Sequence, residues 1–258
     1  MYDDCAAAQE WLREQCADYV FDLAGVLRLK GDLSWPITAV DASNLAQALI
    51  AGRHMLPLPK EPAALANVLE VGIVDFLVER AASVTDVIVG RGTERGYPDF
   101  ELSGPRFGKG FHAVDVKVAR RKVNKKKPPT VTQSRISLYT GNTYFMYPEL
   151  HWPGTIRPFE QYSSHLDVVC VYTLDEDDFG RVADLELLVH PTWTIASKQR
   201  SSTTREYIGA ITNLDALRDG RGEFGDEEAF YKYWREYDFK IGKAVRQQLR
   251  RLLAEGRR

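Results

Sequence analysis

Cysteine is scarce in this sequence, and several common functional motifs are absent. Cys5, Cys16 and Cys170 are an odd number without CxxC spacing, so neither a disulfide framework nor a zinc site is indicated, and we expect reduced thiols. No GxGxxG or GxxxxGKS/T motif occurs, which leaves dinucleotide-binding and P-loop functions without support. The five histidines show no HxxxH or HExxH spacing, and we expect them to be structural or surface residues.

Long apolar runs are missing as well. Nowhere do about 18 apolar residues follow one another, as a membrane-spanning helix requires. The N-terminal MYDDCAAAQEWLREQ is acidic where a signal peptide carries basic residues and an apolar run. The composition, with 44% hydrophobic residues and a mean hydropathy of -0.32, is that of an ordinary folded globule. We therefore expect a cytoplasmic protein without membrane contact, formed at 258 residues as a single domain.

Basic charge is not in excess overall, but it is segregated along the chain. The net charge of -2 argues against a uniformly basic coat that binds nucleic acid indiscriminately. However, the stretch KVARRKVNKKK, from Lys117 to Lys127, holds seven basic residues and no acid, and the C-terminal KIGKAVRQQLRRLLAEGRR is nearly as basic. The segment at 175–186 is acidic. Each run alone is also what a solvated surface looks like, so only co-location with a catalytic motif gives it meaning.

Hydrophobic periodicity predicts a mixed α/β chain. Apolar residues recur at helical spacing in three segments, and the C-terminal segment is predicted as one or two further helices. The predicted helices cover 1–20, 38–52, 63–83 and 226–254. β-Branched composition predicts strands between them. The predicted strands cover 86–90, 98–104, 111–119, 166–174 and 184–196.

One constellation carries chemistry. Asp99 in YPDF is followed sixteen positions later by Asp115 in VDVK, and Lys117 comes two residues after Asp115. Residues i and i+2 of a strand point to the same face, so Asp115 and Lys117 should share one pocket. Carboxylate oxygens are preferred ligands of Mg²⁺, and a lysine beside them can orient a water and offset charge in the transition state of phosphodiester hydrolysis.

This arrangement is the PD-(x)n-(D/E)xK signature of a nuclease superfamily. Taken alone it also arises by chance, with Asp99 capping a turn and Asp115 and Lys117 forming an exposed strand pair. The resemblance extends further, because the chain resembles the EcoRV-like type II restriction endonucleases over roughly residues 56–237. The similar blocks occur in the same order and are LPLPKEPAALANVLE ending at Glu70, YPDF with its step to DVK, RPFEQYSSHLDVVCVYT, WTIASKQRSSTTREYIGAI and EFGDEEAFYKYWREY.

The resemblance implies a fold and an active site. It implies an α/β (α+β) restriction-endonuclease-like fold, with a central mixed sheet flanked by helices, in a U-shaped homodimer around DNA. It implies one or two Mg²⁺ per active site, replaceable by Mn²⁺, with the ion held by Asp99, Asp115 and Glu70 and the attacking water assisted by Lys117. Within the single domain, 1–55 would be a dimerisation or decorating region, 56–237 the catalytic and recognition core, and 238–258 a basic C-terminal helix.

The resemblance also implies where DNA is read. Two loops enter the grooves in this family, and they correspond here to Thr93, Glu94, Arg95, Gly96 and to Ser201, Ser202, Thr203, Thr204, Arg205, Glu206. The second loop departs from the glycine- and asparagine-rich loop of EcoRV. Because arginine favours the O6/N7 edge of guanine, Arg205, with Arg200 or Arg95, suggests a target richer in G·C pairs. Phosphate contacts are expected from Arg120, Arg121 and Lys122 and from the C-terminal helix.

The implied function is Mg²⁺-dependent cleavage of both strands of a short palindromic double-stranded DNA site, with a central, blunt cut and 5′-phosphate ends. A two-fold symmetric site is read economically by a C2 homodimer. A cognate DNA methyltransferase is expected in the same restriction-modification system, though not as a stable partner. Two alternatives are a DNA repair or junction nuclease of the same superfamily, without sequence specificity, and a DNA-binding module that has lost catalysis.

Overall fold

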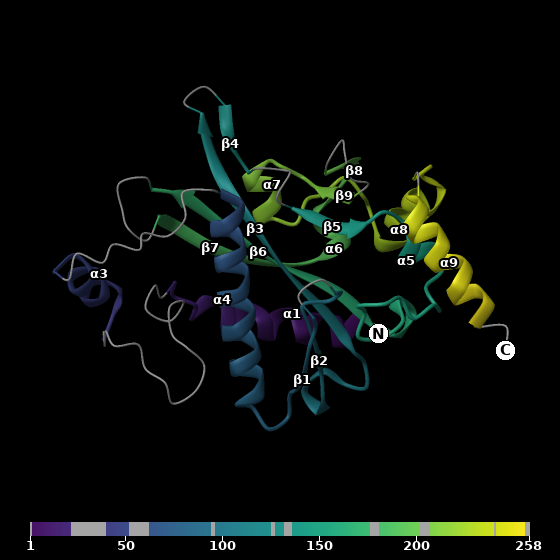
Figure 1. Ribbon diagram of the computed structural model, residues 1–258, viewed down its shortest axis with the longest axis horizontal. Coiled ribbons are helices and arrows are strands. Elements are labelled where there is room, and N and C mark those ends of the chain that lie inside the picture. Colours follow the sequence, from purple (N-terminus) through teal and green to yellow (C-terminus); the bar gives the residue numbers. More distant parts are fainter. Residues whose placement is uncertain are drawn as a thin grey trace.

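A computed structural model describes most of the chain. The described residues are 2–21, 40–51, 62–93, 96–124, 127–131, 136–175, 181–201, 207–239 and 241–255. They form a mixed α/β fold in which a central sheet separates two layers (Figure 1). Two hydrophobic clusters lie on opposite faces of this sheet, one under long helices and the other under a small second sheet with short helices.

The central sheet has the strand order β1-β2-β3-β6-β7, and β4 pairs with the far end of β3. The strands are β1 Ile88–Arg91, β2 Phe100–Ser103, β3 His112–Asn124, β4 Lys127–Val131, β6 Ser164–Leu174 and β7 Val182–Pro191. β3 and β6 are parallel, and the other pairs are antiparallel. The sheet is therefore mixed, as the resemblance implied, and its two longest strands lie side by side at its centre.

Two helices cover one face of the sheet, α1 Tyr2–Ala17 and α4 Pro62–Ala82. On α4, Leu65, Leu69, Ile73 and Leu77 recur every four residues and are fully buried, because this spacing keeps them on the side facing the sheet. α1 buries Ala8 and Leu12 completely in the same cluster and donates a hydrogen bond from its Gln9 side chain to Val189 O of β7 (2.9 Å).

Within the predicted dimerisation or decorating region 1–55, the helix α1 packs in the core against β7 and α4. α3 Ala42–Ala51 follows, and its Leu45 joins the same cluster. Residues 22–39 and 52–61 lie outside the described part of the chain, so a role in dimerisation stays a prediction.

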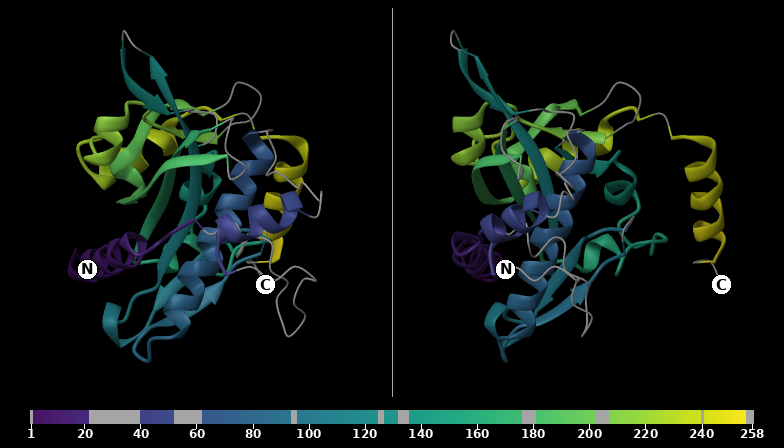
Figure 2. Two further views of the ribbon diagram at one scale, coloured as in Figure 1. Left: turned by 90° about the vertical axis from the view of Figure 1, so that its left-hand side faces the viewer. Right: turned by 60° about the vertical axis from the view of Figure 1, so that its left-hand side comes forward.

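The opposite face carries a three-stranded sheet, in the order β5-β9-β8, and several short helices. These elements are β5 Ser137–Thr140, β8 Ala196–Arg200, β9 Tyr207–Ala210, α5 Thr143–Met146, η3 Phe159–Gln161, α6 Thr192–Ile195, α7 Leu214–Arg218 and α8 Glu227–Glu236. The short helix η1 Pro105–Phe107 packs against α1 on the first face. The last helix, α9 Lys243–Glu255, stands to one side of this body (Figure 2, right).

Two strand predictions were wrong in extent. The strand expected at 184–196 ends at Pro191, because the chain leaves the central sheet through the short helix α6 and enters the second sheet as β8. β3 continues five residues beyond the predicted end at Ala119, because its basic end forms a hairpin with β4. The predicted C-terminal helical segment is two helices, α8 and α9. No helix in the described ranges is both long and apolar enough to cross a membrane.

Candidate active site

The start of β2 and the middle of β3 bring the predicted site residues together. β2 is antiparallel to β3, with Phe100 opposite Val114, so Asp99, just before β2, reaches the next part of β3. There the Asp99 carboxylate accepts a hydrogen bond from the backbone N–H of Val116 (2.6 Å). The acid that precedes one strand is thus fixed between Asp115 and Lys117 of the other.

Asp115 and Lys117 project from the same face of β3, as their i, i+2 spacing predicted. The Lys117 ammonium forms an ion pair with the Asp115 carboxylate, and the two side chains are 18% and 10% exposed. They are therefore not the exposed strand pair that a chance motif would give. An ion pair this well shielded from water needs other groups to compensate its charges, and the neighbouring residues supply them.

Burial and mutual repulsion of carboxylates perturb the acids of this site. Burial, with repulsion from Asp115, raises the pKa of Asp99 from 3.8 to about 8, although Lys117 and the Val116 N–H act in the other direction. Burial lowers the pKa of Lys117, but Asp115 and Asp99 outweigh this effect and hold it above its ordinary value. Perturbed acids clustered around a buried lysine are typical of catalytic sites.

Glu70 approaches the same site from α4. It is partly buried, and burial raises its pKa, while the charge of Lys117 lowers it and that of Asp115 raises it. The charges of Lys117 and Asp115 therefore act on Glu70. A hydrogen bond and an ion pair bring Asp99, Asp115 and Lys117 together, and Glu70 of α4 interacts with this group through its charge.

Asp167 is an acid of this site that the sequence analysis missed. It lies on β6 directly opposite Asp115 in the parallel pairing of the two strands, and it is 1% exposed. Burial, with repulsion from Asp115, raises its pKa to about 7, and the charge of Lys117 lowers it. A signal was present, because Asp167 is the one charged residue within LDVVCVY, a run whose composition predicts a buried strand.

Aromatic side chains of the layer that contains the second sheet pack next to the site. The hydroxyl of Tyr97 is hydrogen-bonded to Nδ1 of His165 (2.7 Å), and the ring of His165 stacks on Phe159. Burial lowers the pKa of His165 to about 3, so this ring is neutral and brings no positive charge to the acids. Tyr97 precedes Pro98 and Asp99 directly, so its packing fixes the chain where the first acid begins.

Metal binding is consistent with the donor set, although the side chains do not form a complete cage. Among the described residues no group of three histidine, cysteine or acidic side chains is arranged to hold a metal ion. Mg²⁺ does not require such a cage, because it keeps several waters and is bound by one or two carboxylates together with substrate phosphate. Asp99 and Asp115 supply two carboxylates, and the surplus of acids over the single Lys117 favours a cation.

The first predicted recognition segment is partly described. Thr93 is exposed, and its carbonyl accepts a hydrogen bond from Gly96 N (2.9 Å). A Cβ on Gly96 would lie 2.0 Å from Gly154 O, so glycine is required there by close packing. Glu94 and Arg95 lie outside the described residues. Gly96 therefore has a structural reason to be glycine, and its contact with DNA stays a prediction.

In the second segment only Ser201 is described. It is 7% exposed, and its hydroxyl is hydrogen-bonded to that of Ser137 (2.9 Å), so it anchors the segment to β5. The side chain of Ser201 faces the protein, and its role in DNA recognition stays a prediction. The remaining residues of this segment lie outside the described chain, namely Ser202, Thr203, Thr204, Arg205 and Glu206.

The basic end of β3 is not uniformly available to phosphate. Arg121 is 11% exposed and donates hydrogen bonds to Thr173 Oγ1 (2.8 Å) and Glu186 Oε1 (2.5 Å). Its guanidinium connects β3 to β6 and β7, and its role as a phosphate contact stays a prediction. Lys122 is exposed and Arg120 is partly buried, and both stay predictions as phosphate contacts.

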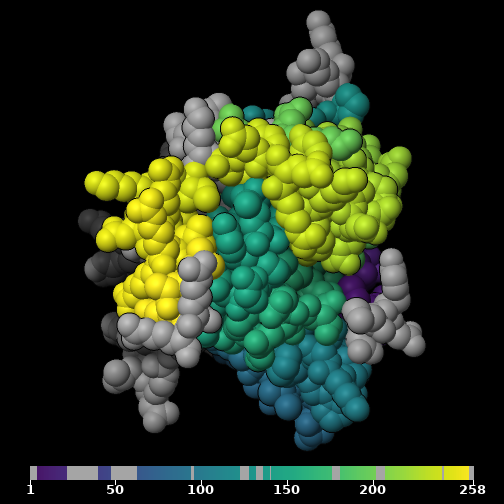
Figure 3. Space-filling model, turned by 90° about the vertical axis from the view of Figure 1, so that its right-hand side faces the viewer, coloured from purple at the N-terminus to yellow at the C-terminus, as the bar shows by residue number. Residues whose placement is uncertain are grey.

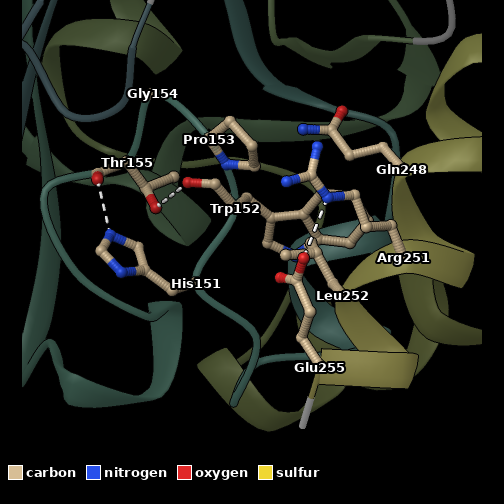
Figure 4. Close-up of a pocket in the computed structure, with 9 residues that line it drawn as sticks. All are labelled: His151, Trp152, Pro153, Gly154, Thr155, Gln248, Arg251, Leu252 and Glu255. Carbon is tan, nitrogen blue, oxygen red and sulfur yellow. Dashed lines mark hydrogen bonds and ion pairs between the residues drawn. The ribbon is translucent and has the colours of Figure 1, made fainter.

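A pocket of about 440 Å³ lies away from the acids. It is formed between the loop 151–155 and α9 (Figure 4). The loop side is held by hydrogen bonds from Thr155 to Trp152 O and between His151 and Thr155 O. The space-filling view shows α9 on one side of the residues coloured teal and the segment that contains α8 on the other (Figure 3). None of the four predicted catalytic residues lines the pocket.

Comparisons with known proteins agree with this architecture. Residues 33–254 match the sequence model of the family described as Restriction endonuclease EcoRV. The chain is also 24% identical over 158 residues to the type II restriction enzyme EcoRV of Escherichia coli, a match that covers 55% of this chain and 61% of that enzyme. Because the family match spans most of the chain, this protein belongs to the EcoRV restriction endonuclease family.

Proposed function

We propose that this protein is a type II restriction endonuclease that hydrolyses both strands of a specific double-stranded DNA site with Mg²⁺. The observation that carries the proposal is the meeting of Asp99, Asp115 and Lys117 at the junction of β2 and β3, in a chain of the EcoRV family. The support for catalysis is the burial of these charges, since a surface cluster would not perturb carboxyl groups to this extent.

Each residue has a distinct chemical task in this proposal. Asp99 and Asp115 would hold the ion through their carboxylate oxygens, and Glu70 would contribute to its water network or to a second ion. When bound, Mg²⁺ neutralises phosphate charge and acidifies a water molecule. Lys117 orients that water and offsets the charge that develops on the phosphate. Attack by the water oxygen breaks the P–O3′ bond and leaves a 3′-hydroxyl and a 5′-phosphate.

Site recognition and symmetry are the finer parts of the proposal. A homodimer would place one active site on each strand of a palindromic site, and a U-shaped arrangement would surround the duplex. The loops around Thr93 and after Ser201 would read the bases, with a preference for a target richer in G·C pairs than that of EcoRV. A central position of the cut would give blunt ends. A methyltransferase of the same specificity would protect the host DNA.

Digestion of a sequenced plasmid tests the proposal. Purified protein with Mg²⁺ should give discrete fragments, and run-off sequencing of their ends should show one palindromic site and the position of the cut. Mn²⁺ should support cleavage, whereas EDTA should abolish it. The Asp115→Ala variant, prepared in parallel, excludes a contaminating nuclease if it is inactive.

The same digestion separates the alternatives. Degradation without discrete fragments, or cleavage restricted to branched DNA, would indicate a repair or junction nuclease of this superfamily. DNA binding without hydrolysis under any of these conditions would indicate a module without catalysis. Cleavage confined to the site that the EcoRV enzyme itself cuts would overturn the expectation of a different target and leave the enzymatic assignment in place.

A further inference from the structure

Asp167 is a buried acid that contributes nothing obvious to the core. Both of its carboxylate oxygens are shielded from water and lack a hydrogen-bond partner among the described residues. The hydroxyl of Thr192 lies beside them and lowers the pKa of Asp167, but it donates its proton to the carbonyl oxygen of His165 (3.3 Å). A buried carboxyl group without hydrogen bonds destabilises a fold.

The surroundings of Asp167 show which group it serves. On the sheet its neighbours are Asp115 of β3 and His190 of β7. Burial lowers the pKa of His190 to about 4, so this ring is neutral near pH 7. The charges that act on Asp167 are those of Asp115 and Lys117, and Lys117 is the positive one. Asp167 in turn raises the pKa of Lys117. The interaction between Asp167 and Lys117 is therefore the favourable one.

The proposed chemistry places a conflicting demand on Lys117. Its ammonium is held by Asp115, and Asp115 is also a proposed ligand of the divalent ion. A bound divalent cation would neutralise Asp115 and repel the ammonium at the same time. An acid on the neighbouring strand, outside the proposed ligand set, would keep Lys117 in place. Asp167 is such an acid, because the strand register puts it directly beside Asp115, two residues before the position beside Lys117.

We propose that Asp167 is a positioning residue that retains the Lys117 ammonium in the active site while Asp115 binds the divalent cation. The inference rests on the proposed nuclease function. This positioning role of Asp167 differs from a purely structural role in one respect. A structural acid should stabilise the fold, whereas Asp167 should destabilise the fold and support cleavage.

Two substitutions test this role. Asp167→Asn keeps the volume and removes the charge, and Asp167→Val matches Val168 and Val169 beside it and removes both polar atoms. The exposed Asp238→Asn is the matched control for loss of one negative charge. The measurements are the thermal midpoint of the metal-free protein, DNA affinity in Ca²⁺, and the single-turnover cleavage rate at saturating DNA and Mg²⁺.

For both Asp167 variants we expect cleavage to slow by about 10²-fold, as displacement of a catalytic group commonly does. The thermal midpoint should be equal to or higher than that of the unmodified protein, and the DNA affinity should be unchanged. Asp238→Asn should match the unmodified protein in all three measurements. Cleavage by both Asp167 variants at the unmodified rate overturns the inference, and so does a lower thermal midpoint in both.

A double-mutant cycle with Lys117→Met tests whether Asp167 acts through Lys117. If it does, Asp167→Asn should slow cleavage much less in the Lys117→Met background than in the unmodified protein. Equal slowing in both backgrounds overturns the inference. Failure of the proposed function is distinguishable, because in that case the unmodified protein itself would cut no DNA with Mg²⁺.

Discussion

The two faces of the central strands β3 and β6 differ in what they do. On the face toward α1 and α4, alternate residues of both strands are apolar and buried, including Val114 and Val116 on β3 and Leu166 and Val168 on β6. On the other face the same strands carry Asp115, Lys117 and Asp167. Neighbouring residues of each strand therefore point to opposite faces and lie in different environments.

The two faces therefore differ in how their side chains contribute to the stability of the fold and to the proposed reaction. The apolar face is packed by α4 and needs no charge compensation, so its side chains stabilise the fold through burial. The other face has its own buried apolar residues, such as Val169 and Val171, but its charged side chains include more acids than bases away from water, and these charged side chains stabilise the fold little or oppose it. Substitutions on the two faces should therefore separate a loss of stability from a loss of activity.

The largest expected effect is on the charged face. Asp99→Asn retains an oxygen that can accept the Val116 N–H and removes the carboxylate charge, so the local hydrogen bond should persist while the proposed ion is held less well. We expect single-turnover cleavage to fall by about 10³-fold, the scale seen when one charge-stabilising group is removed. The thermal midpoint of the metal-free protein should not fall. A marked loss of stability with normal cleavage would contradict the conclusion that the charged side chains serve activity rather than stability.

The next effect is on the apolar face, one residue before Asp167. Leu166→Ala removes a side chain that is 1% exposed, and we expect the free energy of unfolding to fall by about 2–5 kcal/mol through lost burial and a cavity. Urea denaturation measures this change. The remaining folded protein should cleave DNA at the normal rate below the unfolding transition. A strong loss of cleavage by the folded fraction would show that the faces are not independent.

The pH dependence of stability should show the effect of the buried acids on the charged face. The folded-state pKa values of Asp99 and Asp167, about 8 and about 7, lie above 3.8, so the folded protein holds protons that the unfolded chain releases. Stability contributed by these groups is present at low pH and is lost as the pH rises through the folded values. His165 and His190 act oppositely, but only below pH 6.5, because their pKa values are lowered.

Between pH 6.5 and 8 the metal-free protein should therefore become less stable, by at most about 1.4 kcal/mol per pH unit for each acid. Thermal midpoints across this range measure the slope, with Asp99→Asn expected to flatten it. An equal slope in that variant would assign the effect to other groups. Added Mg²⁺ should stabilise the protein more at pH 8 than at pH 6.5, because protons compete with the ion for carboxylate oxygens.

The smallest effect is expected at the basic end of β3. Lys122→Ala removes one exposed charge, and if it contacts a phosphate the slope of log affinity against log salt should decrease by about 0.9. DNA binding in Ca²⁺ at several salt concentrations measures this. Arg121→Ala is the informative control, because it breaks the contact with Glu186 and should lower stability instead. An unchanged salt slope for Lys122→Ala would remove this residue from the DNA surface.

The motif of the site was readable from the sequence because it depends on short spacings. The i, i+2 relation of Asp115 and Lys117 requires only that the segment be a strand, and β3 is one. The apolar, buried side of α4 was predicted for the same local reason, because its residues recur at helical spacing. By contrast, the internal role of Arg121 depends on Thr173 and Glu186, which lie 52 and 65 positions away, so no local pattern indicated it.

Composition and spacing alone indicated five strand segments of the central sheet, the buried helix α4, and the acids and lysine of a nuclease motif, because these features do not depend on distant residues. The packing of the layers was needed to show which charges face one another. The parallel pairing of β3 with β6 places Asp167 opposite Asp115, 52 positions away along the chain. Burial, which raises the pKa of both Asp99 and Asp167, is likewise a property of the packed layers, since it depends on the side chains that exclude water around them.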